Sequence, residues 1–154
     1  VITNLENLQF STELGQILLN DETVQNNLFN NIEKMANKYS VSDIHFDFER
    51  LRGEDRNAYT AFLRKAKERF SSQGITISIA LAPKTSASQQ GIYYEAHDYR
   101  AQGAVVDFVV IMSYEWGYSG GPAQAVSPIG PVRNVLQYAI SEIPSRKVMM
   151  GQNL

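Results

Sequence analysis

Two kinds of hydrophobic periodicity alternate along the chain and restrict what it can fold into. In short segments the apolar side chains recur at every second residue or run unbroken, as in β-strands. In the longer segments between them they recur at every third or fourth residue, as in helices. Strands are expected at residues 1–4, 44–49, 75–81, 105–114 and 147–151. Helices are expected at residues 21–39, 53–74, 93–102 and 131–143, with a polar connection over residues 5–20. This order predicts parallel strands joined by helical crossovers.

Two of the expected helices show a clear apolar face. In the first, with Asp21 as its N-cap, the face consists of Val24, Leu28, Ile32, Met35 and Tyr39. In the second, the face consists of Tyr59, Phe62, Leu63, Ala66 and Phe70. Stripes with this spacing are typical of helices that pack on a sheet, and not of cofactor sites.

Two architectures agree with the alternation, an open doubly wound sheet and a (β/α)8 barrel. Nucleotide-binding doubly wound sheets usually carry a Gly-rich turn between their first strand and first helix. Here the clustered glycines, between Gly117 and Gly121, follow the fourth strand and open no helix directly. Small residues alternate with large ones in the strand at 75–81, which suits the crowded interior of a barrel. The barrel is therefore favoured.

The length of the chain sets how much of a barrel it can form. A full barrel needs ~250 residues for eight units, or roughly 31 per unit, so that a chain of this size makes about five units. We predict an α/β fold in which residues 1–154 form a partial (β/α)8 TIM barrel with about five parallel strands and four intervening helices, as part of a larger barrel domain. Because an open arc leaves two strand edges and apolar inner side chains uncovered, self-association through the open barrel side is expected.

The segment Asp43–Glu49 carries ionisable groups on one strand face. Ile44, Phe46 and Phe48 alternate with His45, Asp47 and Glu49. Since side chains alternate between the faces of a strand, one face is apolar and the other carries an imidazole and two carboxyl groups. Burying such groups is costly unless they find partners. A strand whose polar face simply meets water would show the same alternation, but we expect this face to point into a site.

Polar and aromatic side chains also mark the carboxyl ends of the other expected strands. Barrel enzymes build their sites at these ends. The residues are Asn4, Glu49, Pro83, Lys84, Tyr114, Glu115, Trp116, Gln152 and Asn153. Aromatic faces stack on sugar rings, and carboxyl groups transfer protons at a glycosidic oxygen. A carbohydrate site is therefore expected, although Trp116 could instead pack under the following loop and Lys84 could be structural or solvated.

Composition excludes several further classes of protein. The net charge of −2 argues against a general nucleic-acid binder, which needs a basic surface. Cysteine is absent, so thiolate metal sites and Cys nucleophiles are excluded. No apolar run approaches the ~20 residues of a membrane span, and the start of the chain lacks a signal-peptide pattern. His45, Asp47 and Glu49 could in principle bind a metal, but the second histidine, His97, is expected in a helix. No metal or cofactor is therefore expected.

Three motifs resemble glycoside hydrolase family 18, the chitinase family. The segment Ile44–Glu49 resembles the signature of the fourth barrel strand, with acids at alternate positions and the catalytic Glu at the end. Met112–Glu115 resembles the Met-x-Tyr-Asp motif of the sixth strand, and residues 143–151 resemble the run into the seventh. The resemblance covers the chain as strands three to seven. His-x-Asp-x-Glu, Ala80–Lys84 and Tyr114–Tyr118 place it nearest to spore-cortex peptidoglycan N-acetylglucosaminidases.

The resemblance implies roles for individual residues. Glu49 would be the general acid/base, Asp47 would orient the 2-acetamido group of the substrate, and Tyr114 would hydrogen-bond its carbonyl oxygen. The chain departs from the family pattern at His45 and Ser42, where the family has Asp, and at Glu115, which replaces an Asp. The relay that feeds charge to Asp47 must therefore differ. The expected substrate-binding residues are Glu115, Trp116, Met112, His45, Asn4, Gln152 and Asn153.

The implied activity is hydrolysis of β-1,4 bonds in an N-acetylglucosamine-containing glycan, with spore-cortex or cell-wall peptidoglycan as the expected substrate. The implied mechanism is retaining, with the acetamido oxygen of the substrate as the nucleophile. From the residues alone, Glu115 stays open as a second possible nucleophile. The residues are also compatible with a non-catalytic peptidoglycan- or chitin-binding module, or with an inactive fragment. The resemblance implies action at the spore or cell envelope.

Overall fold

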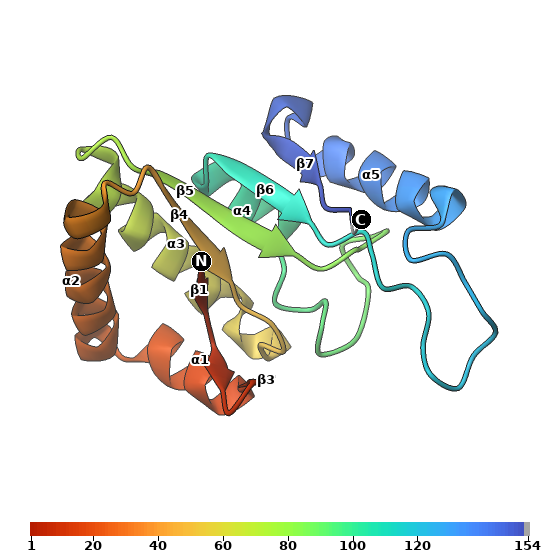
Figure 1. Cartoon of the computed structure of the whole chain (residues 1–154), viewed down its shortest axis with the longest axis horizontal. Coiled ribbons are helices and arrows are strands. Elements are labelled where there is room, and N and C mark those ends of the chain that lie inside the picture. The colour runs from red at the N-terminus through yellow and green to blue at the C-terminus, as the bar shows by residue number, and fades with distance from the viewer. Residues whose placement is uncertain (153–154) are drawn as a thin grey trace.

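The chain folds into a curved sheet of five parallel strands. In this computed structural model, which describes residues 1–152, the strands lie in the order β1-β4-β5-β6-β7, and each one pairs in parallel with its neighbour (Figure 1). The strands are β1 (Ile2–Thr3), β4 (Asp43–Asp47), β5 (Thr76–Leu81), β6 (Phe108–Ile111) and β7 (Val148–Met150). The expected arc of a barrel is confirmed.

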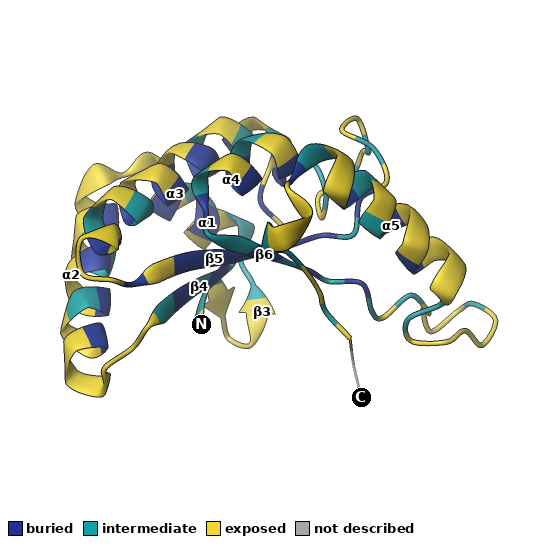
Figure 2. Cartoon of the chain, turned by 90° about the horizontal axis from the view of Figure 1, so that it is seen from above, coloured by how far each residue is buried: buried dark blue, intermediate teal, exposed yellow. Residues whose placement is uncertain are grey.

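The α-helices pack on one face of the sheet, and the opposite face is open (Figure 2). They are α1 (Thr12–Asn20), α2 (Glu22–Tyr39), α3 (Arg56–Ser71), α4 (Tyr99–Val105) and α5 (Ile129–Glu142), and single 3₁₀ turns occur at Gly53–Asp55 and Ser145–Lys147. The first crossover holds two helices, α1 and α2, where the sequence indicated one. The described chain therefore has one more helix than expected.

The expected polar connection over residues 5–20 is wrong. It contains a hairpin of β2 (Leu5–Glu6) and β3 (Gln9–Phe10), whose two turn residues, Asn7 and Leu8, both have positive φ. Helix α1 follows, capped by the Ser11 hydroxyl, which accepts a hydrogen bond from the Leu14 N–H. Leu14, Ile17 and Leu18 have helical spacing, but Leu14 and Ile17 are exposed, so only the tertiary contacts of Leu18 and Leu19 reveal the buried face.

The face of α2 that meets the sheet also differs from the expected one. The buried residues are Gln25, Phe29, Ile32 and Ala36. Met35 and Tyr39, expected in the core, are 53% and 59% exposed. Gln25 is buried because its amide donates to the Leu18 and Leu19 carbonyl oxygens at the end of α1, which ties the two helices together. The α3 face, in contrast, is buried as expected from Tyr59 to Phe70.

Helix α4 begins later than the expected helix at 93–102. Asp98 is its N-cap and accepts a hydrogen bond from the Ala101 N–H, so His97 lies in the preceding loop and not in a helix. Val105, expected in a strand, is the last residue of α4, and β6 is correspondingly shorter than the run at 105–114. An apolar run without alternation does not show where a helix ends and a buried strand begins.

The register of the sheet separates its two faces. Ile44, Phe46 and Phe48 point to the helices and are buried in the main core with the isoleucines of β5. On the open face, His45 lies beside Ser78 of β5, which in turn lies beside Phe108 of β6. Because successive side chains alternate, the ionisable face of β4 is the interior face of the barrel arc.

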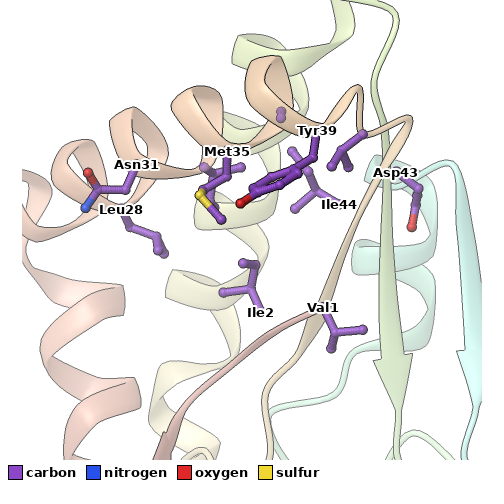
Figure 3. A pocket seen from close by; sticks show the side chains of 11 residues that line it. Val1, Ile2, Leu28, Asn31, Met35, Tyr39, Asp43 and Ile44 are labelled. Carbon is purple, nitrogen blue, oxygen red and sulfur yellow. The ribbon is translucent and has the colours of Figure 1, made fainter.

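Both edges of the arc have apolar surroundings. At the β1 edge, an apolar hollow lies between β1, β4 and α2, where Ile2 faces Leu28, Met35 and Tyr39 (Figure 3). At the β7 edge, a second hollow is lined by apolar side chains of α5 and β7, namely Ile129, Val132, Leu136, Ile140 and Met150. Within residues 1–152, the helices are too short or too polar to cross a membrane.

Candidate active site at the carboxyl ends of the strands

Four ionisable side chains gather where β4 and β6 end. Asp47 is the last residue of β4 and Glu49 follows two residues later, so both leave the strand on the open face. Tyr114 and Glu115 follow β6. Burial is the main cause that raises the pKa of Glu49, and the charges of Asp47 and Glu115 raise it further. Burial likewise raises the pKa of Tyr114, with contributions from Asp47, Glu115 and Glu49. The four groups therefore share one electrostatic environment.

Asp47 lies deepest in this group. Burial raises the pKa of its carboxyl group, while His45 lowers it. Within the described part of the chain, Asp47 Oδ1 is buried and has no hydrogen-bond partner. A buried carboxyl oxygen without a partner is costly, and it is a ready acceptor for a ligand N–H.

The backbone beside Glu49 is held from both sides. From β1, the Asn4 side chain accepts a hydrogen bond from the Glu49 N–H at 3.0 Å and donates one to the Glu49 carbonyl oxygen at 2.9 Å. From beyond β5, His97 Nε2 is 3.1 Å from the carbonyl oxygen of Phe48. Asn4 was expected among the substrate-binding residues, but it is 1% exposed. Its amide holds the chain that carries Glu49 and does not face the open site.

His97 belongs to a buried network that joins the ends of β4 and β5. Its Nδ1 accepts a hydrogen bond from the Ala82 N–H at 2.7 Å. Burial lowers the pKa of His97 to about 4, so the imidazole is neutral. Lys84, expected to be structural or solvated, is buried, and its Nζ donates to the His97 carbonyl oxygen at 2.9 Å. The structural interpretation of Lys84 is therefore the correct one.

His45 is linked to β5 by a second set of hydrogen bonds. Its Nδ1 lies 2.8 Å from the hydroxyl of Ser78, and that hydroxyl donates to Asp43 Oδ2 at 2.8 Å. Burial lowers the pKa of His45, against the charges of Asp47 and Asp43, which raise it. His45 thus faces the interior of the arc below Asp47, with its ring orientation set from the neighbouring strand.

The loop after β6 is anchored at β7. The Ser113 hydroxyl donates to the Gly151 carbonyl oxygen at 2.7 Å, and the ring of Tyr114 packs so closely on Gly151 that a Cβ there would lie 2.8 Å from it. Glu115 and, on the other side of the site, Arg50 both have positive φ. For residues other than Gly this conformation is strained, and such strain is often found at functional sites.

A hollow of about 400 Å³ opens next to Tyr114 and Glu115. It is lined by Pro83, Thr85, Ser86, Gln89, Tyr94, Tyr114, Glu115 and Trp116. Trp116 is half-buried against the core, so it both packs under the loop and borders the hollow, and the two interpretations of this residue are compatible. Hydroxyl, amide and aromatic groups around one hollow are suited to a sugar ring.

Two further expected site residues, Met112 and Gln152, do not line this hollow. Met112 is half-buried at the end of β6, and its N–H donates to the Leu81 carbonyl oxygen. Gln152 borders the hollow at the β7 edge, together with residues of α5. Asn153 lies outside the described residues. The sequence predicts no site role for His97 or Ser78, because neither lies at a strand end. The parallel register brings Ser78 to β4, and the path of the loop after β5 brings His97 to the end of β4.

His45, Asp47 and Glu49 are all residue types that can ligate a metal ion. Across residues 1–152, no three His, Asp or Glu side chains come together in a group that could hold a metal ion. The polar groups around Glu49 are instead arranged as hydrogen-bonding partners, with carboxyl groups of raised pKa next to a tyrosine. Such an arrangement serves proton transfer.

Asp47 and Glu49 stand at the end of β4 in an arc of parallel strands, as in the strand signature that the sequence resembles. The chain belongs to the glycosyl hydrolases of family 18, whose model matches residues 9–154. It is 66% identical to the cortical fragment-lytic enzyme of Bacillus subtilis (strain 168) over 154 residues, which are the whole of this chain and 36% of that protein. It is 35% identical to the putative sporulation-specific glycosylase YdhD of the same organism, covering 97% of this chain and 35% of that protein.

Solved structures show the same likeness. The spore cortex-lytic enzyme SleL of Bacillus cereus matches 99% of this chain and 35% of its own chain, with 57% identity and a TM-score of 0.94. A chitinase from Chromobacterium violaceum matches 97% of this chain and 47% of its own, with a TM-score of 0.88; at 22% identity this likeness concerns the fold alone. The chain therefore spans about a third of the length of its similar curated relatives.

Proposed function

We propose that this chain carries the catalytic acid/base residue of a glycoside hydrolase. The enzyme would cleave β-1,4 bonds in N-acetylglucosamine-containing glycan, with spore-cortex peptidoglycan as the substrate. The observation that carries the proposal is the pairing of Asp47 and Glu49 at one strand end, both with a raised pKa, near Tyr114. The cortical fragment-lytic and cortex-lytic names of the relatives support the choice of substrate and a place of action at the spore.

In this proposal Glu49 is the general acid and then the general base. Its raised pKa favours the protonated carboxyl group, which can donate to the glycosidic oxygen. Asp47, with a buried oxygen that has no partner among the described residues, accepts the acetamido N–H of the substrate. Tyr114 donates to the acetamido carbonyl oxygen. Glu115, Trp116 and Met112 border the sugar, and Asn4 acts by positioning Glu49.

The acetamido oxygen is proposed to attack the anomeric carbon. As the C–O bond to the leaving sugar breaks, Glu49 gives its proton to that oxygen, and an oxazolinium ion forms. Glu49 then removes a proton from water, which opens the ring and restores the original configuration. An internal nucleophile that is held in line makes this step intramolecular, which lowers its barrier.

The test of the proposed activity is Glu49→Gln in the complete protein. Glutamine keeps the size of the side chain but can neither give nor take the proton. We expect release of reducing ends from spore-cortex peptidoglycan and from chitin oligomers to fall by at least about 100-fold, with glycan affinity nearly unchanged. Glu54→Gln, an exposed acid on the following 3₁₀ turn, is the matched control and should leave the rate unchanged. Equal activity of Glu49→Gln and the wild type would exclude Glu49.

The test of the proposed mechanism is a matched pair of glycans, acetylated and de-acetylated at the cleaved residue. If the acetamido oxygen is the nucleophile, only the acetylated glycan should be cleaved, and the product should retain its configuration. An ordinary retaining enzyme instead uses a second carboxylate about 5 Å from the acid. Equal cleavage of both glycans would make Glu115 the candidate nucleophile.

We further propose that residues 1–154 are part of a larger barrel domain, with the apolar edges at β1 and β7 meeting further strands and helices. The support is the share of the relatives that this chain spans, together with the two apolar hollows at the edges. When no further strands or helices cover the edges at β1 and β7, we propose that two molecules of this chain associate through the open side of the barrel.

A further inference from the structure

Arg50 directly follows Glu49 and is exposed just beyond the carboxyl end of β4. In a continuing strand its side chain would join Phe48 on the helix-facing side, where a charge is costly to bury. Its φ of 56° ends the alternation, so Arg50 stays exposed and the next residue, Leu51, enters the core with 1% exposure. A residue other than Gly is strained in this left-handed conformation. The strained turn thus presents an arginine beside the proposed acid.

The guanidinium group of Arg50 has no ion-pair or hydrogen-bond partner within residues 1–152. It lies instead over the ring of Tyr93, with 5.9 Å between Cζ and the ring centroid. The neighbouring arginines differ from it. Arg52 pairs with Glu54 at 3.3 Å, and Arg56 Nε donates to a backbone carbonyl oxygen at 2.8 Å. Of the arginines in residues 50–56, Arg50 alone is left unpaired by the described part of the chain.

The backbone that carries Tyr93 is held in place from the segment after β4. Tyr93 belongs to the turn at residues 92–96, and Arg56 binds this turn through the Glu95 carbonyl oxygen. The Glu95 side chain packs so closely on Gly53 that a Cβ there would lie 2.5 Å from its carboxyl oxygen. The aromatic ring is therefore positioned by residues that directly follow Arg50 in the sequence.

Arg50 and Tyr93 border the proposed sugar site. Arg50 is one residue from Glu49, and Tyr93 is one residue from Tyr94, which lines the hollow beside Tyr114. The charges that shift the pKa of Glu49 are those of other acids, so Arg50 does not serve to tune the acid. An exposed cation–π contact is weak, whereas a carboxylate accepts two parallel hydrogen bonds from a guanidinium group. A carboxylate is therefore the ligand that this arginine favours.

We propose that Arg50, supported by the ring of Tyr93, binds a carboxylate group of the glycan beside the active site. This deepens the proposed function, on which it rests, because it concerns the choice of substrate. Chitin, a polymer of N-acetylglucosamine, is neutral. In peptidoglycan, alternate sugars are N-acetylmuramic acid, whose lactyl group ends in a carboxylate or carries a peptide with carboxylates of its own. The site thus selects an acid-bearing glycan over a neutral one.

The test is ligand binding by the complete protein that carries Glu49→Gln, so that hydrolysis does not interfere. Titration calorimetry compares N-acetylglucosaminyl-β-1,4-N-acetylmuramic acid, the same disaccharide with an alanyl-glutamyl peptide on its lactyl group, and neutral chitobiose. We expect one or both acidic ligands to bind more tightly than chitobiose, and added salt to reduce the difference. The preferred acidic ligand identifies the lactyl or the peptide carboxylate as the group that is bound.

Arg50→Gln, added to this protein, tests the arginine, and Arg52→Gln is its matched control. Glutamine has the same backbone cost as arginine at positive φ, and the side chain is exposed, so the fold should not change. We expect Arg50→Gln to weaken binding of the preferred acidic ligand by about 3- to 10-fold and to leave chitobiose binding unchanged. Tyr93→Leu should weaken binding of the acidic ligand by a smaller factor. Arg52→Gln should change neither ligand, since Arg52 is paired with Glu54.

The outcomes separate this proposal from the proposed function. If chitobiose and both acidic ligands bind equally well, the glycan site stands and the carboxylate site is refuted. An unchanged affinity in Arg50→Gln, or an equal loss in Arg52→Gln, would refute the role of Arg50, and an unchanged affinity in Tyr93→Leu would refute the role of the ring. If none of the three ligands binds, the proposed glycan site is refuted and the carboxylate site with it.

Discussion

At the scale of single residues, the site depends on side chains that never need to touch a substrate. Asn4 bonds to both backbone polar groups of Glu49, and its amide also donates to the Ser11 carbonyl oxygen at 3.0 Å. The position of Glu49 is thus determined by the neighbouring strand and not by its own rotamer alone. Since a general acid must lie within hydrogen-bond reach of its oxygen, small displacements of this backbone change the rate.

Asn4→Ala should lower both stability and activity. It leaves the Glu49 N–H and carbonyl oxygen without their partners, and unsatisfied buried groups cost about 1–3 kcal/mol. Denaturant unfolding measures the loss, and kcat should fall along with it. Thr12→Val is the control. It removes the exposed hydrogen bond from the Thr12 hydroxyl to the carbonyl oxygen of Arg50, the residue after Glu49, and should change stability by no more than about 0.5 kcal/mol. Equal effects of the two changes would contradict this role of Asn4.

His97 makes stability depend on pH. Its pKa is about 4 in the folded chain against an ordinary value of 6.5, so the unfolded state binds more protons between these values. Stability from this residue is therefore complete above pH 6.5 and is lost as the pH falls toward 4, by roughly 3 kcal/mol in total. Unfolding curves at several pH values should show this slope, and His97→Gln, although less stable, should show less of it. An unchanged slope in that variant would assign the pH dependence to other groups.

At the scale of elements, helix α4 can pack against the end of α5 because Gly103, at the contact, has no side chain. A Cβ on Gly103 would lie 2.7 to 3.1 Å from three side-chain atoms of Ile143, which is itself buried. Helix propensity alone would favour Ala at this position by up to about 1 kcal/mol. The close approach outweighs this preference, because the buried Ile143 would have to shift to admit the added methyl group.

Gly103→Ala and Gly130→Ala should therefore have different effects. Gly103→Ala should destabilise the protein by about 1–3 kcal/mol through overpacking. At Gly130, in the first turn of α5, an added Cβ meets no atom within 4 Å apart from those of its chain neighbours. The next residue, Pro131, disfavours the helical conformation for a preceding residue with a Cβ, which offsets the better helix propensity of Ala, so Gly130→Ala should change stability by less than about 1 kcal/mol. Thermal unfolding of the two variants measures both effects. A gain for Gly103→Ala would mean that Ile143 yields to the added methyl group.

At the scale of the whole molecule, the arc has one covered face and two open edges (Figure 2). Met35 and Tyr39 are half exposed beside β1, and Met150, the last residue of β7, is 48% exposed. Unpaired parallel strands with apolar surroundings tend to find partners. In the larger domain that we propose, these surfaces would be internal.

Residues 1–154 expressed alone should therefore self-associate. Light scattering should give a mass above that of one chain, and Met35→Glu combined with Met150→Glu should reduce it, because charges at both edges oppose burial. Tyr118→Ser, which changes a 70% exposed aromatic residue in the loop after β6, is the control and should leave the mass unchanged. A stable, monodisperse monomer of the unmodified chain would contradict the prediction.

The sequence by itself determined the order of the elements, the parallel sheet and the polar face of β4. These follow from local periodicity, which depends on neighbours along the chain: the alternation in residues 44–49 and the apolar stripe of α3 were both readable. Helix α1 and the start of α4 were missed because their buried faces are short and their signals are the capping residues Ser11 and Asp98.

Tertiary structure alone decided which side chains support the acids. Asn4, Ser78 and His97 are 45, 33 and 49 residues from their partners in the sequence. No local pattern encodes such contacts, since they depend on the register between strands and on the path of the loop after β5. The same holds for α2, where the neighbouring α1 buries Gln25 and the open edge leaves Met35 exposed. The sequence thus identified the acids, whereas the parallel register and the path of the loop after β5 brought the groups that position them.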